Sequence, residues 1–449
     1  MKMLFRLGLS FFIFGLINNV LYVIILSAAL DLVPPSTPKG IIAFCNITPS
    51  LIAKFGWPYI LKGRIRYGRR LVVCSAMTVS GVIVVAAFES LYMRLLGITF
   101  ASFSSAGLGE LTFLQLSTRY RPPSVAGHSV GYFASGTGAA GLVGALLWWE
   151  LRGLGVRTGV GLSSMLPLVI PATYFLLLPR PAAFNEADIP SVGDEAAVPA
   201  VPYIALPTGD GEEAEADGPL HALPEAEDTK HGVALSAGDK WRLVKPLLPK
   251  YMLPLCQSYP ASQFEYTINQ GIAPTLIYPV PSPDEHWIMS KIIHSIRDYY
   301  PLWQLVYQTT VFLSRSTISL GLPALPARLL PLPALVQAAV LGTLALESAA
   351  GILGGAREGA SFALVFALIA VEGICGGLAY VNVYHRVNQE QASLGGDAER
   401  AKQEREFKIG AVGLADGTGI LLASLVSMPT EVGLCRAQVA RGKTFCQNL

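Results

Sequence analysis

Runs of apolar residues, each about as long as a bilayer is thick, dominate this sequence. A helix that crosses the hydrocarbon core needs roughly 20 mostly apolar residues. Eleven segments meet that requirement, at 7–30, 40–61, 71–90, 95–116, 130–149, 160–178, 247–278, 302–320, 330–351, 360–383 and 409–428. Inside lipid every backbone polar group needs a partner, which a helix provides within its own segment. The sequence therefore predicts an all-α polytopic membrane protein with about 11 transmembrane helices.

Composition excludes the main alternative classes. Hydrophobic residues make up 52% of the 449 residues and charged residues 14%, whereas a soluble domain has about 25% charged residues. Too few charges remain to cover a soluble protein of this size, which argues against a soluble enzyme, a disordered chain and a nucleic-acid binder. His-Glu-x-x-His, Gly-x-Ser-x-Gly and Walker-type phosphate loops are absent from the sequence. We therefore expect no enzyme activity, no cofactor and no metal.

The six cysteines are scattered without paired spacing, so neither a disulfide framework nor a zinc site is expected. The run Cys446-Gln447-Asn448-Leu449 has the length of a prenylation box. Gln and Asn are poor aliphatic substitutes, and eleven spans would place this tail in the lumen, away from cytosolic prenyl transferases. Lipidation of Cys446 would therefore count against the span number.

A change of composition divides the chain into four parts. Residues 182–239 hold thirteen Asp or Glu against one Lys and no Arg, as an acidic, disordered linker does. We expect a six-helix N-terminal half at 1–179, an acidic cytosolic linker at 180–245, a five-helix C-terminal half at 246–430 and a tail at 431–449. The tail is too polar to supply a twelfth span.

Basic residues beside the spans indicate the orientation, because loops rich in Lys and Arg stay in the cytosol. These residues are Lys2, Arg6, Lys62, Arg64, Arg66, Arg69, Arg70, Arg180, Lys240, Arg242, Lys245 and Lys250. The N-terminus, the loop after the second span and the linker then share the cytosolic side, and the C-terminus is lumenal.

The two halves echo each other at a separation of six spans. The matched pairs are 17–19 with 268–270, Glu110 with Glu372, 135–138 with 416–419, and the basic loop after the second span with 314–316. Four matches in the same order are typical of two parallel repeats. In the major facilitator architecture, which is built this way, substrate binds at the midplane between the halves.

Several motifs in both halves resemble those of the battenin family. They are Asn18-Asn19 followed by Ser27-Ala28-Ala29 and Asp31, 107–114, 135–142, 265–271, Tyr307-Gln308 with 314–316, and 372–382. Residues 273–276 resemble the fungal branch, and Pro260 before Glu265 departs from the family pattern. The resemblance implies a multi-pass protein of the vacuolar or lysosomal membrane, linked to vacuolar pH homeostasis, basic amino-acid transport and clearance of glycerophosphodiesters.

Four carboxylates inside the spans are the main site candidates: Glu110, Glu265, Glu372 and Asp416. Ionisable groups in the membrane are costly and usually face the bundle interior or a water-filled cavity. The functional interpretation is a cluster that binds protons or a cation. The structural alternative is an interhelical hydrogen bond, or a group just inside the interface.

The remaining candidates are amides and one arginine: Asn18, Asn19, Asn269, Gln270, Asn382 and Arg315. Amides donate and accept hydrogen bonds, so these could contact a polar solute or bridge helices. Arg315 could pair with a carboxylate at the mouth of a cavity or bind a phosphate bidentately. The alternative is an arginine that only sets the topology.

We therefore expect a secondary transporter that moves a small polar solute, a basic amino acid or a glycerophosphodiester, between two helical halves. Its expected partners are membrane lipids, the solute and protons, with no nucleic acid and no protein partner identified. The alternative is a non-transporting membrane scaffold that affects trafficking and vacuolar pH indirectly, with the acidic linker as its working part.

Overall fold

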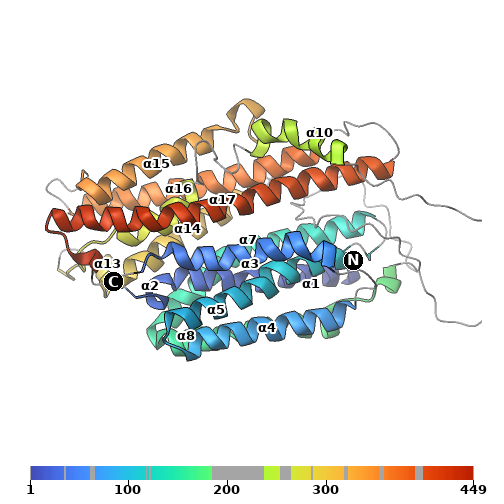
Figure 1. The fold of residues 1–449 in the computed structure, drawn as a ribbon, viewed down its shortest axis with the longest axis horizontal. Coiled ribbons are helices and arrows are strands. Elements are labelled where there is room, and N and C mark those ends of the chain that lie inside the picture. The colour runs from blue at the N-terminus through green and yellow to red at the C-terminus, as the bar shows by residue number, and fades with distance from the viewer. Residues whose placement is uncertain are drawn as a thin grey trace, which may run out of the picture.

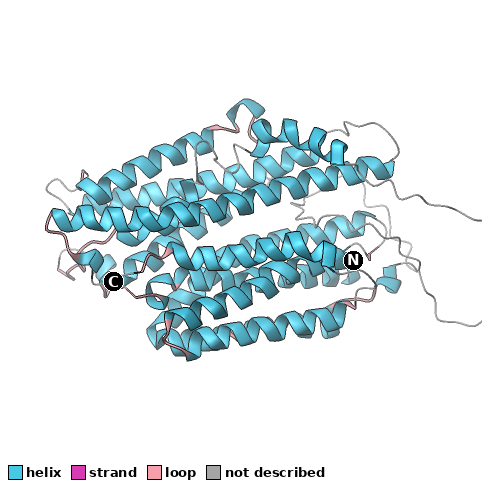
Figure 2. Ribbon diagram, viewed as in Figure 1, coloured by secondary structure: helices cyan, strands magenta, loops and turns pink. Residues whose placement is uncertain are grey.

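A computed structural model of the chain describes residues 2–34, 37–60, 66–117, 119–120, 123–184, 237–252, 264–284, 287–317, 322–352, 358–389 and 398–447. Every regular element in these residues is a helix (Figure 2), which confirms the all-α prediction. Most of the acidic linker, residues 185–236, lies outside the described ranges.

The N-terminal half contains long helices and several short helical turns. Its elements are α1 (Lys2–Ser27), α2 (Ala29–Leu32), α3 (Gly40–Ile60), α4 (Tyr67–Ala87), α5 (Leu91–Ser102), η1 (Phe103–Gly109), α6 (Glu110–Ser117), α7 (Pro123–Leu151), η2 (Arg152–Leu154), α8 (Gly155–Ser163), η3 (Leu166–Leu168), α9 (Val169–Ala172), η4 (Thr173–Leu177) and η5 (Pro181–Phe184).

The described part of the C-terminal half contains the two longest helices. Its elements are α10 (Ala237–Leu247), η6 (Leu248–Met252), α12 (Phe264–Thr267), η7 (Ile268–Ile272), η8 (Ala273–Thr275), α13 (Trp287–Ser290), η9 (Ile296–Asp298), α14 (Tyr299–Arg315), η10 (Ala327–Leu329), α15 (Leu332–Ala350), α16 (Glu358–Gln389), α17 (Ala398–Ala440) and η11 (Phe445–Gln447). The tail expected from residue 431 is helical as far as Ala440, because its polar side chains find partners on other helices.

The long helices lie along one common axis and form two groups (Figure 1). One group holds α1, α3, α4, α5, α7 and α8, and the other holds α14, α15, α16 and α17. The N-terminus and the C-terminus lie at opposite ends of this bundle (Figure 1), as an odd number of spans requires.

Six described helical segments are long and apolar enough to cross a membrane. They are Met3–Ser27, Tyr67–Ala87, Gly131–Leu177, Ala327–Ala350, Ser361–Val387 and Ala415–Ala440. Among the described residues, the remaining predicted spans are helical over 40–60, 95–116, 247–252, 264–275 and 302–315. The π-helix η1 interrupts span 95–116, and η7 and η8 interrupt span 247–278.

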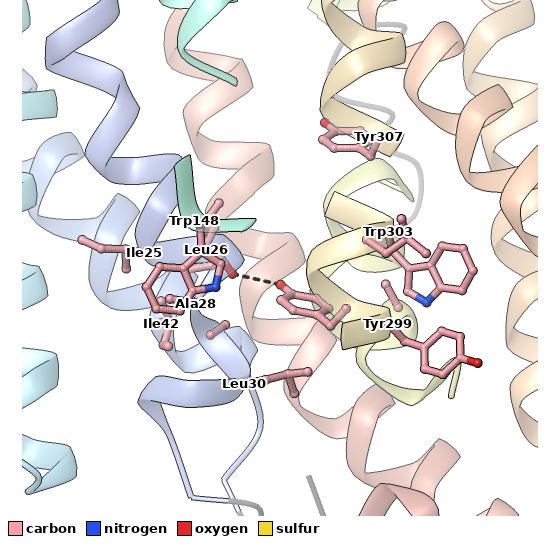
Figure 3. Packing of buried hydrophobic residues seen from close by; sticks show 14 of the residues in the cluster. Ile25, Leu26, Ala28, Leu30, Ile42, Trp148, Tyr299, Trp303 and Tyr307 are labelled. Carbon is pink, nitrogen blue, oxygen red and sulfur yellow. Dashed lines mark hydrogen bonds between the residues drawn. The ribbon is translucent and has the colours of Figure 1, made fainter. Parts of the chain in front are cut away.

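Aromatic and aliphatic side chains from both halves form the largest core cluster. Figure 3 shows Leu26 and Trp148 from the N-terminal half on one side, and Tyr299, Trp303 and Tyr307 of α14 on the other. Trp148 and Trp303 are fully buried. The core therefore extends across the boundary between the halves at this level of the bundle.

Glycines allow α1 and α7 to pack backbone against backbone. A Cβ at Gly136 would collide with the backbone carbonyl of Phe12, and a Cβ at Gly144 would lie 2.9 Å from the carbonyl of Val20. The spacing of 136, 140 and 144 predicts such a face from sequence, and the packing of these glycines confirms it. By contrast, a Cβ at Gly138 would meet nothing within 4 Å.

These two glycines give a matched test of the packing. We expect Gly136→Ala to destabilise the protein by about 1–3 kcal/mol, because the added methyl must push α1 and α7 apart. Gly138→Ala should be neutral or slightly stabilising, since alanine favours helix. Thermal unfolding of both variants in detergent would measure the difference, and equal midpoints would contradict the close packing.

Candidate functional site

The seventh predicted span is broken where its candidate residues lie. α12 has one helical turn, the π-turn η7 follows at once, and Pro274 lies in the 3-10 turn η8. Short π segments recur at functional sites, and interrupted membrane helices often carry the binding groups of transporters. Glu265, Asn269 and Gln270 all lie on this broken segment.

Glu265 and Asp416 line one small cavity together with Arg315, and Tyr266 and Tyr380 complete most of its wall. The cavity leaves about 20 Å³ for the centre of a water molecule. It is therefore large enough for a water molecule as it stands, and a larger solute requires side chains or helices to move. Three of the ten predicted site residues, from three different helices, thus meet at one place.

Hydrogen bonds and a ring contact hold the charged groups of this cavity in place. The Tyr307 hydroxyl donates a hydrogen bond to Glu265, and Gln337 Nε2 lies 3.5 Å from the other Glu265 oxygen. The Arg315 guanidinium stacks on the Tyr380 ring at 4.1 Å from the ring centroid. Its Nε is buried without a hydrogen-bond partner among the described residues. Burial of a donor without a partner is costly, so this Nε marks a place for water or a polar ligand.

Glu372 lies near this cavity, and a network of amide side chains is hydrogen-bonded to it. Its side chain is fully buried, and Asn269 Nδ2 donates to its Oε1 at 2.8 Å. Gln304 in turn donates to Asn269, and Gln337 donates to the Glu372 backbone carbonyl at 3.0 Å. The second carboxylate oxygen, Oε2, has no hydrogen-bond partner within the described ranges. Gln337 thus bridges the Glu265 and Glu372 sites.

Gln270 is the most unsatisfied polar side chain of the broken segment. It is buried, and neither of its two side-chain polar atoms has a hydrogen-bond partner among the residues that the structure describes. Burying a polar group without a partner is costly, so such a group marks a place for water or a ligand.

The N-terminal candidates are separate and mostly satisfied. Glu110 pairs with Lys54 at 2.9 Å, and Asn18 accepts hydrogen bonds from Ser105 through its backbone and side-chain oxygens. Asn19 donates back to the carbonyl of Gly15 on its own helix. Asn18 also lines a small, mostly apolar cavity between α1, α4 and η1.

Asn382 has a structural environment. Its Oδ1 accepts from the backbone N–H of Leu325 at 2.7 Å, and its Nδ2 donates to the carbonyl of Leu378. It therefore fastens the segment before α15 to α16.

Four polar contacts join the two halves at the end of the bundle that holds the C-terminus. The buried Lys39 Nζ lies 3.4 Å from Glu431, whose other oxygen accepts the Lys39 backbone N–H at 2.5 Å. The other contacts are Arg152 with Asp298 at 3.0 Å, Arg297 with Asp31 at 3.9 Å, and the Tyr300 hydroxyl with the carbonyl of Leu26 at 3.2 Å (Figure 3). We call these the inter-half contacts.

The hydrogen-bond and ion-pair partners of the candidate residues were not predicted from the sequence. Tyr307 was noted only within a family motif, and Gln337, Lys54, Lys39 and Glu431 were not singled out. An amide in the middle of an apolar span was the available signal for Gln337. Glu431 lay in the segment expected to be a polar tail.

Comparisons with known proteins agree with this architecture. The family described as CLN3 protein, or battenin, matches residues 9–437. Protein BTN1 of Mycosarcoma maydis is 45% identical over 99% of this chain and 89% of its own length, and Protein BTN1 of Cryptococcus neoformans is 44% identical over 99% and 96%. The chain belongs to the battenin family. The battenin resemblance predicted from its motifs is therefore confirmed.

Solved structures show that this battenin-family chain has a major-facilitator-like fold. A bacterial homologue of the human lysosomal transporter Spinster, in an inward-facing and occupied conformation, has a TM-score of 0.52 at 14% identity, over 98% of this chain and 84% of that one. The unoccupied form has a TM-score of 0.50 at 13% identity, over 99% and 92%. At this identity the likeness concerns the fold alone.

The inter-half contacts generate a prediction about closure of the battenin-family bundle. Glu431→Gln leaves Lys39 buried without a counter-charge, which costs about 3–5 kcal/mol in comparable pairs. The halves should then separate more often at this end, and a reporter cysteine at the buried Ser27 should be alkylated at least tenfold faster.

Alkylation of Ser27→Cys, followed by mass spectrometry of its peptide, would measure this rate. The control is the apolar pair Lys39→Met with Glu431→Leu, which removes both charges together and should return the rate toward that of the parent. An unchanged rate in Glu431→Gln would contradict a closing role for the pair.

Proposed function

We propose that this protein is a secondary transporter of a small polar solute in the vacuolar membrane. The observation that carries the proposal is the cavity where Glu265, Asp416 and Arg315 meet. Desolvated charges of both signs, gathered on helices of a two-half bundle, suit a solute that itself carries both signs. The family resemblance supports the vacuolar location and a link to vacuolar pH.

The charges of the cavity favour a basic amino acid over a glycerophosphodiester. Two carboxylates and one guanidinium line the cavity, which suits a solute with more positive than negative groups. The ammonium groups of the solute would face Glu265 and Asp416, and its carboxylate would face Arg315. A glycerophosphodiester without an amine head group would use Arg315 alone and would be repelled by both carboxylates.

Proton coupling would use the same carboxylates. A protonated carboxylate no longer attracts an ammonium group, so acidification should release a basic solute and neutralisation should favour its binding. Glu372 would act on this equilibrium through Asn269 and Gln337, which connect it to the cavity wall.

The alternative function is a non-transporting scaffold whose working part is the acidic linker. The buried carboxylates of the cavity favour transport, because a scaffold has no need of them. Deletion of residues 182–239 separates the two, since a transporter should keep its activity without the linker and a scaffold should lose its effect on trafficking.

Neutral amide variants test the proposed site. Glu265→Gln and Asp416→Asn should each reduce uptake of lysine or arginine into proteoliposomes at least tenfold, about 2 kcal/mol for one lost charge contact. The residual uptake should respond less to an imposed pH gradient than that of the parent. Glu372→Gln should change the pH response, because it alters the group that Asn269 contacts.

The control for these variants is Asp284→Asn, which removes a carboxylate from an exposed loop. It should transport like the parent. If all three amide variants are folded, reach the membrane and transport with the pH response of the parent, the carboxylates are structural hydrogen-bonding groups and the mechanism fails.

A further inference from the structure

The end of the chain folds back and is joined covalently to α17. Cys435 lies near the end of α17, Cys446 lies in η11, and the two form a disulfide with a Cα–Cα distance of 5.8 Å. Cys446 is buried. The expectation that the cysteines form no disulfide is therefore wrong for this pair. Their separation of 11 residues gave no recognisable motif, and only the turn after α17 brings them together.

Further contacts anchor this end of α17 to the rest of the C-terminal half. Gln438 donates to the carbonyl of Thr275 at 2.8 Å and to the Ser348 hydroxyl at 2.9 Å. Arg441 donates to the carbonyl of Ser348 at 2.9 Å, and the Lys443 ammonium lies 5.0 Å from the centroid of the Tyr278 ring. The disulfide thus closes a loop at residues 435–446, which we call the C-terminal hook. The C-terminal hook lies against the ends of α15 and η8.

We propose that Cys435 and Cys446 form a structural disulfide in the lumen of the organelle, and that this bond fastens the chain end over the lumenal end of the C-terminal half. Disulfides persist in oxidising compartments and are rare in the reducing cytosol. The C-terminus, close to which the pair lies in the chain, is at the end of the bundle opposite the N-terminus (Figure 1).

Charge supports the same orientation independently. Arg66, Arg69 and Arg70 lie at the start of α4. Because α1 and α3 run in opposite directions along the bundle, α4 begins at the end where α1 begins. Lys- and Arg-rich loops mark the cytosolic side. The disulfide, which persists in an oxidising compartment, and the arginines at the start of α4, which mark the cytosolic side, therefore both place the C-terminal hook on the lumenal side.

Formation of the bond requires an oxidant, which we assign to a lumenal thiol–disulfide oxidoreductase. One cysteine thiolate attacks the disulfide of this enzyme, which forms a mixed disulfide and releases one enzyme thiol. The thiolate of the other cysteine attacks the sulfur of its partner in the mixed disulfide, which forms Cys435–Cys446 and releases the second enzyme thiol. Two cysteine thiols are oxidised, and one enzyme disulfide is reduced to a dithiol.

The disulfide also determines whether Cys446 can be prenylated. A prenyl group would need its sulfur as a thioether, and that sulfur is already joined to Cys435. The proposal therefore excludes lipidation of Cys446 in the folded protein.

Sequential thiol labelling of the full-length protein tests the proposal. Free thiols in denatured vacuolar membranes are blocked with N-ethylmaleimide, disulfides are then reduced, and the new thiols are labelled with a polyethylene-glycol maleimide. We expect two polymer additions in the parent and in the control Cys375→Ser, a buried free cysteine. Cys435→Ser and Cys446→Ser should each lose both additions.

The side of the membrane is tested on sealed vacuoles. An impermeant reductant added outside should leave the disulfide intact until the membrane is permeabilised. Reduction in sealed vacuoles would overturn the lumenal assignment. Blocking of both cysteines before reduction, or a prenyl thioether on the Cys446 peptide, would overturn the disulfide, and both results come from the parent protein even if the variants fail to fold.

Discussion

The need to match each buried charge within a low-dielectric bundle organises this protein. An unpaired ion inside the membrane is costly, so each one either finds a partner or awaits one. Glu110 has Lys54 and Glu431 has Lys39, and these pairs hold helices together. The cavity between α12, α14 and α17 differs from these pairs, because Glu265, Asp416 and Arg315 line one space that is large enough for a water molecule. We propose that this shared cavity, rather than either structural ion pair, receives the solute.

The two halves are both helical bundles, but they differ in helix packing and in the surroundings of their buried carboxylates. In the N-terminal half, glycines bring α1 and α7 together, and Glu110 is neutralised locally. In the C-terminal half, the helix that carries Glu265 is broken, and polar side chains of α14, α15 and α16 surround it. The inter-half contacts close one end of the bundle. Because they join residues of both halves, their breakage would open a path from that end, as alternating access requires.

Apolar periodicity and short motifs predicted the class, the two halves and the family, because these features are local in sequence. They also singled out Glu265, Asp416 and Arg315 among ten candidate residues, since charges in apolar spans are conspicuous, but they did not predict that these three lie together. The partner of each group was not predictable, because Lys39 and Glu431 are 392 residues apart and only packing brings them together. The breaks at η1 and η7 also depend on tertiary contacts, which supply partners for the freed backbone groups.

Covalent locking of the closed end tests alternating access most directly. A Cβ at Gly40 on α3 would lie 3.2 Å from Ser427 Cβ on α17 and 2.8 Å from the Ser424 carbonyl, so a small separation of the two helices brings the Cβ atoms to the spacing of about 3.5–4.5 Å in a disulfide. In the variant Gly40→Cys with Ser427→Cys, oxidation should abolish uptake of lysine or arginine into proteoliposomes, and reduction should restore it, while the parent is unaffected by either treatment. Undiminished uptake by the fully cross-linked protein would contradict transport by separation of the halves at this end.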